Sequence, residues 1–214
     1  MDKRRHIPVS LQMCLIAITV GVVVMASDVY RRQSAIRLIN RAGGKVHGEF
    51  PGPMWLKGML HRNRLSGLGE VRTVTFLAVD TPREAFDVIG RLPTLERLVI
   101  AGPEVTDAAV GKLQGLGRLR LLFIYDSNIT DVGLAHLSSL TSLEQLHVSA
   151  SDVTDSGLMH LRKLSRLTAL ELHTPRVSKE ASDRLKIDMA RASPSINDDW
   201  SGNRSFAFPE WDLH

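Results

Sequence analysis

The side chains best suited to chemistry in this sequence are His147, Glu171 and His173. Two imidazoles and a carboxylate can hold a zinc ion, and a histidine beside a carboxylate can also transfer protons in general acid–base catalysis. His147 and Glu171 are 24 residues apart, however, so they meet only if the chain brings residues at that spacing together. The elements that position them therefore have to be identified first.

Other signatures of catalysis or cofactor binding are absent from the sequence. It contains no glycine-rich loop followed by a lysine, no G-x-S-x-G and no H-E-x-x-H. The single cysteine, Cys14, excludes a disulfide within the chain and a cysteine-rich zinc site. His136 and His160 are also 24 residues apart, but the equivalent places elsewhere hold charged residues, which favours a solvent-facing position. We therefore expect no resident cofactor.

A motif recurs along the chain with a period of 24 residues. NITDVGLAHLSSL at residues 128–140 returns as DVTDSGLMHLRKL at residues 152–164, and EVTDAAVGKLQGL at residues 104–116 precedes both. One stack of repeating units is indicated, because a single unit cannot bury its own apolar face whereas neighbouring units share a core. The units open at equally spaced residues: Val71, Leu95, Leu119, Leu143 and Leu167.

Each unit has the pattern of a strand, a bend and a helix. Apolar residues in the pattern LxxLxI, as at residues 119–124, predict a strand with one buried face. Thr-Asp pairs such as Thr130-Asp131 then provide side-chain oxygens that can cap a helix. Leucines at a spacing of three, as in residues 134–140, predict a helix with one apolar side. Five such units fill residues 71–191.

The region that precedes the repeats contains an uncharged apolar run from Pro8 to Ala26. Its 19 residues would span about 28 Å as a helix, close to the hydrocarbon thickness of a bilayer. The basic arm at residues 1–7 makes a cleaved signal peptide the alternative, but the run is long for one. We expect a single-pass membrane anchor with the repeats on the non-cytoplasmic side, although arginines on both flanks leave the positive-inside rule undecided.

The net charge of +4 is unevenly distributed. Residues 1–66 carry 11 Lys and Arg against 3 Asp and Glu, and the remainder carries 16 against 20. A nucleic-acid-binding protein would place its basic patch on the folded domain, so we expect no nucleic-acid partner.

Two segments flank the repeats. Residues 27–70 predict a juxtamembrane helix that stops at Gly43 and Gly44, a short strand at residues 45–50, and a cap that shields the first apolar layer of the stack. The tail, residues 192–214, either covers the far end of the stack or extends into solvent.

The repeat signatures LxxLxI and VTD/ITD resemble those of the leucine-rich-repeat family. The resemblance implies an α/β solenoid with a short parallel sheet on the concave side and helices on the convex side. With the transmembrane helix, the chain is similar to membrane-anchored bacterial leucine-rich-repeat proteins, most of which have no established activity. The family's buried asparagine is replaced in four units, which weakens its ladder of bonds to the backbone: Pro103, Ser127, Ser151 and Pro175.

Within this arrangement, places three, five and seven of each strand face away from the core, onto what we call the open face. Three large apolar or aromatic residues stand there on the middle strand, and no core requirement explains them; aromatic residues are enriched in interface hot spots. The predicted partner-binding residues are Leu121, Phe123, Tyr125, His147, Glu171 and His173. In an alternative, aromatic residues of the tail cover this face: Phe206, Phe208 and Trp211.

The sequence therefore predicts a membrane-anchored protein-interaction module without catalytic activity of its own. One alternative is a metal-assisted hydrolase that uses His147, Glu171 and His173. Another is a substrate adaptor like those of ubiquitin ligases, which would need an F-box that residues 1–66 do not resemble.

Overall fold

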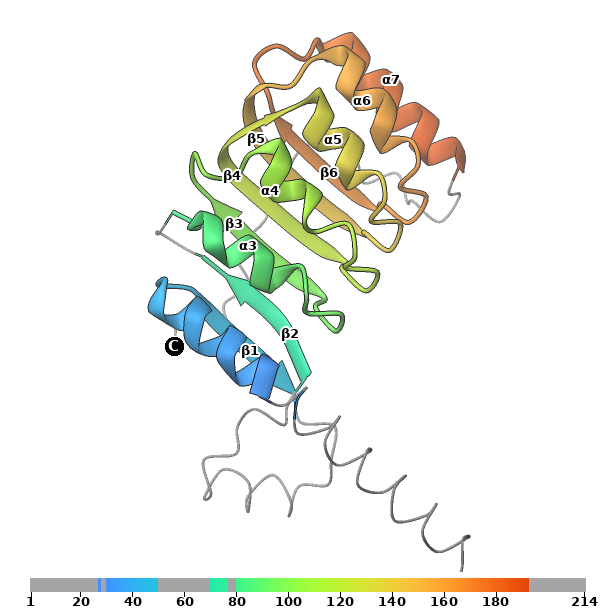
Figure 1. Cartoon of the computed structure of the whole chain (residues 1–214). Helices are drawn as coiled ribbons and strands as arrows, with labels where there is room; N and C mark the ends of the chain where they lie inside the picture. Colours follow the sequence, from blue (N-terminus) through green and yellow to red (C-terminus); the bar gives the residue numbers. More distant parts are fainter. Residues whose placement is uncertain (1–26, 28–29, 50–69, 77–79, 193–214) are drawn as a thin grey trace, which may run out of the picture.

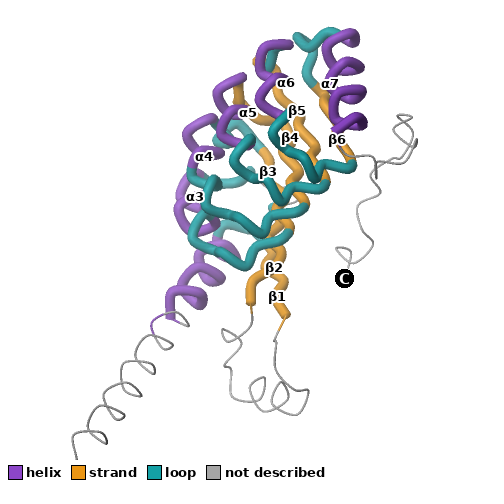
Figure 2. Tube along the Cα trace, turned by 90° about the vertical axis from the view of Figure 1, so that its right-hand side faces the viewer, coloured by secondary structure: helices purple, strands orange, loops and turns teal. Residues whose placement is uncertain are grey.

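The computed structural model describes residues 27, 30–49, 70–76 and 80–192. In this part of the chain the strands form one six-stranded sheet in the order β1 to β6, and the helices lie together on one of its faces (Figure 1, Figure 2). The strands are β1 (Lys45–Glu49), β2 (Glu70–Thr75), β3 (Arg97–Ala101), β4 (Leu121–Thr130), β5 (Gln145–Asp152) and β6 (Ala169–His173). The helices are residues 30–41, α3 (Arg83–Ile89), α4 (Asp107–Gly111), α5 (Asp131–Leu137), α6 (Asp155–Leu161) and α7 (Lys179–Ala192).

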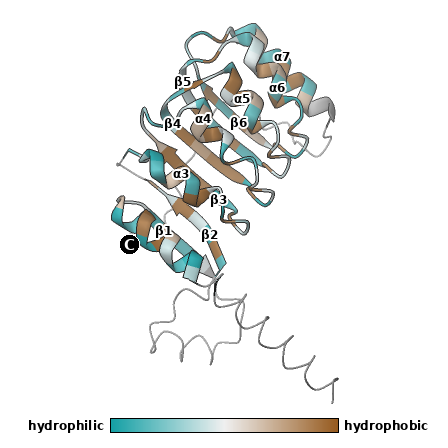
Figure 3. Ribbon diagram, in the orientation of Figure 1, coloured by the Kyte–Doolittle hydropathy of each residue, from teal (hydrophilic) through white to brown (hydrophobic). Residues whose placement is uncertain are grey.

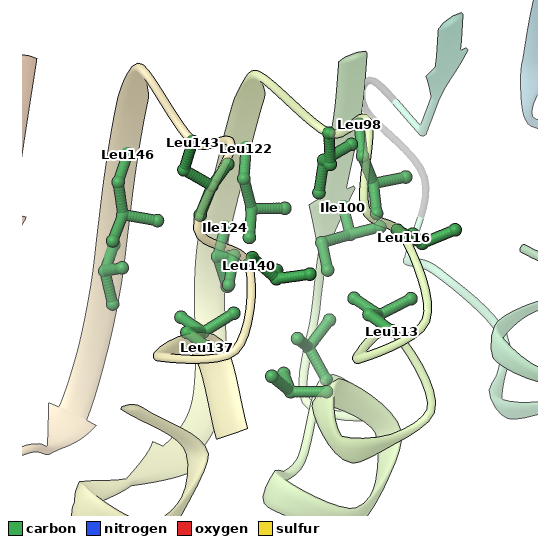
Figure 4. Close-up of a cluster of buried hydrophobic side chains, with 14 of the residues drawn as sticks. Leu98, Ile100, Leu113, Leu116, Leu122, Ile124, Leu137, Leu140, Leu143 and Leu146 are labelled. Atoms are coloured by element: carbon green, nitrogen blue, oxygen red, sulfur yellow. The ribbon is translucent and has the colours of Figure 1, made fainter. Parts of the chain in front are cut away.

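Strands β2 to β6 are parallel, and their residues pair at the period of the sequence repeat. Leu98 aligns with Leu122, Leu122 with Leu146, and Leu146 with Leu170, each pair 24 residues apart. The first three of these side chains are fully buried, and Figure 4 shows them pointing toward the leucines of the turns. Figure 3 shows β3 and the first half of β4 as largely hydrophobic. The α/β architecture expected of the repeats is therefore present in the described residues.

The sheet has one strand more than the repeats supply. β1 pairs with β2 in the antiparallel direction, so the backbone edge of the first repeat is hydrogen-bonded rather than exposed. The chain reaches this strand from helix 30–41 through Gly43, whose φ of 84° a side chain would disfavour. A Cβ on Gly44 would lie 2.7 Å from the Ile39 side chain and 2.8 Å from Phe76, so only glycine allows this close packing.

The helices of the repeats are shorter than their leucine pattern predicts. α4 ends at Gly111, whereas the expected helix extended to Leu116. Leu113 and Leu116 are nevertheless fully buried. They lie in tight turns in which an amide donates to the carbonyl three residues before it, with Leu116 N to Leu113 O at 3.0 Å and Leu119 N to Leu116 O at 3.1 Å. Each unit has only 24 residues in which to leave one strand and reach the next, so turns replace the last part of the helix.

Helices cover both ends of the stack in the described residues. Ala35 and Ile39 of helix 30–41 are buried against the first repeat, and Leu185 and Met189 of α7 are buried against the last. Among the described residues, α7 covers the far end of the stack. No helix among the described residues has the length and apolarity needed to cross a bilayer. The predicted transmembrane segment, residues 8–26, and the tail beyond residue 192 lie outside the described residues, and the predicted domain boundaries stay predictions.

Candidate functional site

The open face is seen most clearly on β4, where successive side chains alternate between the core and the opposite face. Leu122 and Ile124 are fully buried in the core, whereas Leu121, Phe123 and Tyr125 lie on the opposite face and are half-buried. This follows from strand geometry, since successive side chains point to opposite sides of a sheet. The register brings Val99 beside Phe123, and Phe123 beside His147, as the repeat period predicted. On β2, by contrast, the outward-facing Thr73 and Thr75 are buried, so the face is not uniformly open.

The aromatic rings on this face form a small cluster. Phe123 and Tyr125 lie nearly parallel with ring centroids 6.5 Å apart, and the His147 ring is 4.6 Å from Tyr125 but 6.2 Å from Phe123. His147 pairs with Phe123 in the backbone register, as the repeat predicts, and the register of β4 shifts only after Ile124. Asp126 has a φ of 48° there, in the left-handed region. Such an irregularity redirects the neighbouring side chains, and it accompanies the approach of Tyr125 to His147.

The three residues proposed for chemistry do meet in the structure. Glu171 lies between the two histidines: its Oε2 is 3.1 Å from His147 Nδ1, and its Oε1 is 3.3 Å from His173 Nε2. The two imidazole rings are 5.1 Å apart, edge to face. His147 is only 6% exposed, which differs from the solvent-facing side chain that the strand pattern predicts, whereas the His173 side chain is 60% exposed. We call Phe123, Tyr125, His147, Glu171 and His173 the aromatic–histidine cluster.

Burial determines the charge of this cluster. It lowers the pKa of His147, and the hydrogen bond and charge of Glu171 oppose that effect only in part, while the charge of His173 adds to it. Burial also raises the pKa of Tyr125, and the charge of Glu171 raises it further. The imidazole of His147 and the phenol of Tyr125 are therefore neutral near pH 7. The cluster offers neutral hydrogen-bonding groups and apolar rings beside one carboxylate.

The next question is whether these side chains are arranged to bind a metal ion. In the described part of the chain, no group of three or more His, Cys, Asp or Glu residues is arranged to hold a metal ion. Glu171 directs one oxygen toward each histidine, so the three side chains lie in a row, with a hydrogen bond to His147 and a 3.3 Å contact to His173, instead of converging on one point.

A second set of residues, which the repeat pattern did not predict, lies at the turn that follows each strand. The Thr-Asp pairs are expected to cap helices, and Thr106, Thr130 and Thr154 do accept a hydrogen bond from an amide of the first helical turn. The aspartates, however, bind the next unit. Asp107 accepts bonds from Thr130 N at 2.8 Å and Thr130 Oγ1 at 2.7 Å, and Asp131 repeats this with Thr154 at 2.8 and 2.6 Å.

Asp155 makes the same pair of bonds to Ser178, both at 2.7 Å, so the series reaches the last unit. We call Asp107, Asp131 and Asp155 the aspartate ladder. The ladder links neighbouring units in a chain that lacks the asparagine typical of leucine-rich repeats. The buried Ser127 makes a further link, because its hydroxyl donates a bond to Ser149 O at 2.9 Å. The repeated Thr-Asp-x-Gly could have predicted this contact between units, because its glycine leaves room for the aspartate of the preceding unit. A Cβ on Gly133 would lie 2.5 Å from Asp107 Oδ1, and one on Gly157 would lie 2.3 Å from Asp131 Oδ1.

Comparisons with known proteins give matches among solved structures alone, and these are limited. No protein-family model matches the chain, and no curated protein matches it. Among solved structures, the chain is similar to an internalin from Listeria monocytogenes, with 22% identity, a TM-score of 0.42, and coverage of 52% of this chain and 30% of that one. The aligned part is therefore less than a third of the internalin. The resemblance to leucine-rich repeats accordingly rests on this chain's own period of 24 residues and on its stacked strand–turn–helix units.

Proposed function

We propose that this protein is an interaction module that binds a protein partner through the open face around Tyr125. The supporting observation is the aromatic–histidine cluster together with Leu121. Core positions of the parallel strands carry Leu, Ile, Val or Phe in every unit, as stacking requires. The open-face positions follow no such rule, and only β4 among the described strands carries three large side chains there.

The cluster defines the chemistry of the partner. Phe123 and Tyr125 provide rigid apolar area, which is typical of interface hot spots. Glu171 is the single acidic residue of the cluster, and its two carboxylate oxygens lie next to the two histidines. A complementary segment would place an apolar side chain against the rings and a donor group, such as an amide or a lysine, near Glu171. In this proposal His147, Glu171 and His173 position the partner and catalyse no reaction.

Membrane attachment through residues 8–26 is the second part of the proposal. A small repeat array offers at most about 800 Å² per partner, the area of an ordinary interface, so affinity is modest. Tethering both partners to one membrane raises their effective concentration and strengthens such binding without new contacts. The full-length protein should remain with membranes through an alkaline carbonate wash, at its uncleaved mass. Release of a soluble form that begins at Ser27 would instead establish a cleaved signal peptide.

The orientation of the repeats is tested separately. With the repeats on the non-cytoplasmic side, protease added to intact spheroplasts should degrade them, and a cytoplasmic marker should survive. Protection of both would reverse the proposed orientation while leaving the anchor in place.

The binding site is tested by photocrosslinking in native membranes. A photoreactive amino acid at Leu121, in the full-length protein, should crosslink to a partner protein, and Phe123→Ala with Tyr125→Ala should abolish this crosslink without lowering the melting temperature substantially. Val132→Ala with Met159→Ala is the matched control, because these side chains are 56% and 53% exposed on the helical side. It should leave the crosslink unchanged.

Two outcomes would overturn the site. A crosslink of unchanged yield in a folded Phe123→Ala, Tyr125→Ala variant would move partner binding elsewhere, for example to the helical face where His136 lies 2.6 Å from Gln114. A crosslink within the chain to residues 193–214 would show that the tail covers the open face, with Phe206, Phe208 and Trp211 as its anchors.

A further inference from the structure

A second surface feature lies at the amino-terminal end of the stack, away from the open face. It is a groove of about 790 Å³ between helix 30–41 and the turn that joins α3 to β3. Its floor includes Ala35, Val71 and Leu92, all of them buried and apolar. Arginines from both sides line it: Arg31 and Arg32 from the helix, and Arg91 from the turn. We call this the basic groove.

The charge of the basic groove is not balanced by its lining. None of the described residues that line it is Asp or Glu. Arg31 and Arg32 form no ion pair within the described part of the chain, whereas five other Arg and Lys side chains there pair with carboxylates. Asp87, on α3, is held 2.8 Å from Lys112. The pKa of Asp87 is lowered first by that lysine. Arg91, like Arg31 and Arg32, forms no ion pair among the described residues.

The serine and threonine hydroxyls of the groove are already engaged, which leaves the guanidinium groups and the hydroxyl of Tyr30 as its donors. Thr94 Oγ1 donates to Val71 O at 2.9 Å, and Ser34 Oγ donates to Tyr30 O at 2.9 Å. An arginine donates two parallel hydrogen bonds to a phosphate, and such charge-assisted bonds are stronger than neutral ones. A groove with arginines at its rim and an apolar floor therefore matches a ligand that has a phosphate next to a hydrocarbon part.

The position of the groove in the chain points to the source of such a ligand. Arg31 follows the predicted membrane segment by five residues, so it lies within about 18 Å of Ala26 even if the chain between them is fully extended. The rim also carries Tyr30, which is 67% exposed, and Leu38, which is 36% exposed. Tyrosine beside a membrane segment is typical of the interface between bilayer and water.

We propose that the basic groove binds the headgroup of an anionic phospholipid. This inference rests on the proposed membrane anchor, because residues 8–26 would place the groove at headgroup level. Arg31, Arg32 and Arg91 bind the phosphate, and the apolar floor covers the glycerol and the first methylene groups. The bound lipid would hold helix 30–41 in a fixed orientation against the membrane and so orient the repeats above it. Basic pockets next to membrane helices recognise lipid headgroups by the same electrostatics.

The test uses the full-length protein in mixed lipid–detergent micelles. Native mass spectrometry measures how much phosphatidylglycerol and phosphatidylcholine it retains. The wild type should retain phosphatidylglycerol preferentially, and Arg31→Gln, Arg32→Gln, Arg91→Gln should reduce that retention by about tenfold or more, because arginines near an anionic headgroup contribute additively. Arg37→Gln, Arg41→Gln, Arg118→Gln is the matched control: it removes the same charge from exposed arginines that do not line the groove.

The outcomes separate this proposal from its alternatives. Equal loss in both triple variants would show nonspecific attraction and overturn the site, and so would absence of any preference for phosphatidylglycerol. Competition by inorganic phosphate or glycerol phosphate as effective as that by the lipid would assign the groove to a soluble phosphate compound instead. All variants keep residues 8–26, so the carbonate wash reports on the anchor independently of lipid retention.

Discussion

The turn that follows each strand repeats its contacts from unit to unit, whereas the open face changes its residues at every strand. At the turns, Asp107, Asp131 and Asp155 make the same two bonds to the next unit, with lengths that differ by no more than 0.1 Å. On the open face, the place occupied by Phe123 holds Val99, His147 and Glu171 in the neighbouring strands.

This difference separates residues that maintain the stack from residues that are available for function. A stacked unit contacts only its neighbours, so every interface must solve the same packing problem, and the same residues solve it each time. A position that breaks the period is not needed for stacking. The aromatic–histidine cluster consists of such positions, and the arginines of the basic groove do not repeat from unit to unit either, whereas the aspartate ladder does. The following substitutions compare the two kinds of position directly.

The largest expected effect is on a core leucine. Leu122→Ala should lower the free energy of unfolding by about 2 to 5 kcal/mol, because it leaves a cavity at a fully buried place. Leu146→Ala should behave in the same way. Leu121→Ala, next to Leu122 but half-buried on the open face, should cost only about 1 kcal/mol. Urea unfolding followed by circular dichroism measures all three, and equal losses at positions 121 and 122 would mean that the strand's faces are misassigned.

The aspartate ladder provides the next comparison. Asp131→Ala should cost about 1 to 3 kcal/mol, since it leaves the amide and hydroxyl of Thr154 without their partner. Asp152→Ala removes the same charge nearby, but its ion pair with Arg176, at 3.0 Å, is exposed on both sides and is worth at most about 1 kcal/mol. Thermal unfolding of the two variants should therefore differ clearly. A smaller loss for Asp131→Ala than for Asp152→Ala would contradict a structural role for the ladder.

The glycines beside the ladder test its geometry. Gly157→Ala should cost about 1 to 3 kcal/mol, because the new Cβ would lie 2.3 Å from Asp131 Oδ1 and 3.1 Å from its Cα. Gly117→Ala is the control, since a Cβ there has no heavy atom within 4 Å. Removal of the clash should rescue part of the loss, so Gly157→Ala should be less harmful in an Asp131→Ala background. Purely additive losses would show that the two residues do not compete for space.

The smallest expected effect is a change in pH dependence at His147. Burial lowers the pKa of this imidazole below the value of about 6.5 in an unfolded chain. Between the lowered folded pKa and about pH 6.5 the unfolded chain binds the extra proton, so stability falls as the pH decreases through this range. His147→Gln should reduce that slope in urea unfolding at a series of pH values. His173→Gln, at an exposed place, should reduce it less, and the reverse order would argue against burial as the cause.

Much of the fold and part of the candidate site follow from the repeat. The spacing of 24 residues predicts which leucines are buried, which strands are neighbours, and that Phe123, His147 and Glu171 share one row. It does not predict that the His147 ring lies nearer to Tyr125 than to its register partner Phe123, nor the left-handed backbone at Asp126, because neither follows from the spacing of the repeat. The burial of His147 could not be predicted either, since it results from side chains of adjacent strands rather than from its own place in β5.

By itself, the sequence determined the period, the alternation within each strand and the threonine caps, because these depend on residues close together in the chain or at one fixed spacing. Only the tertiary structure decided that β1 joins the sheet in the antiparallel direction, that each aspartate binds the next unit, and that arginines 60 residues apart line one groove. In each of these cases the outcome depends on how two packed units are placed relative to each other. That placement arises only when the core is assembled, since the buried side chains fix the spacing of the units.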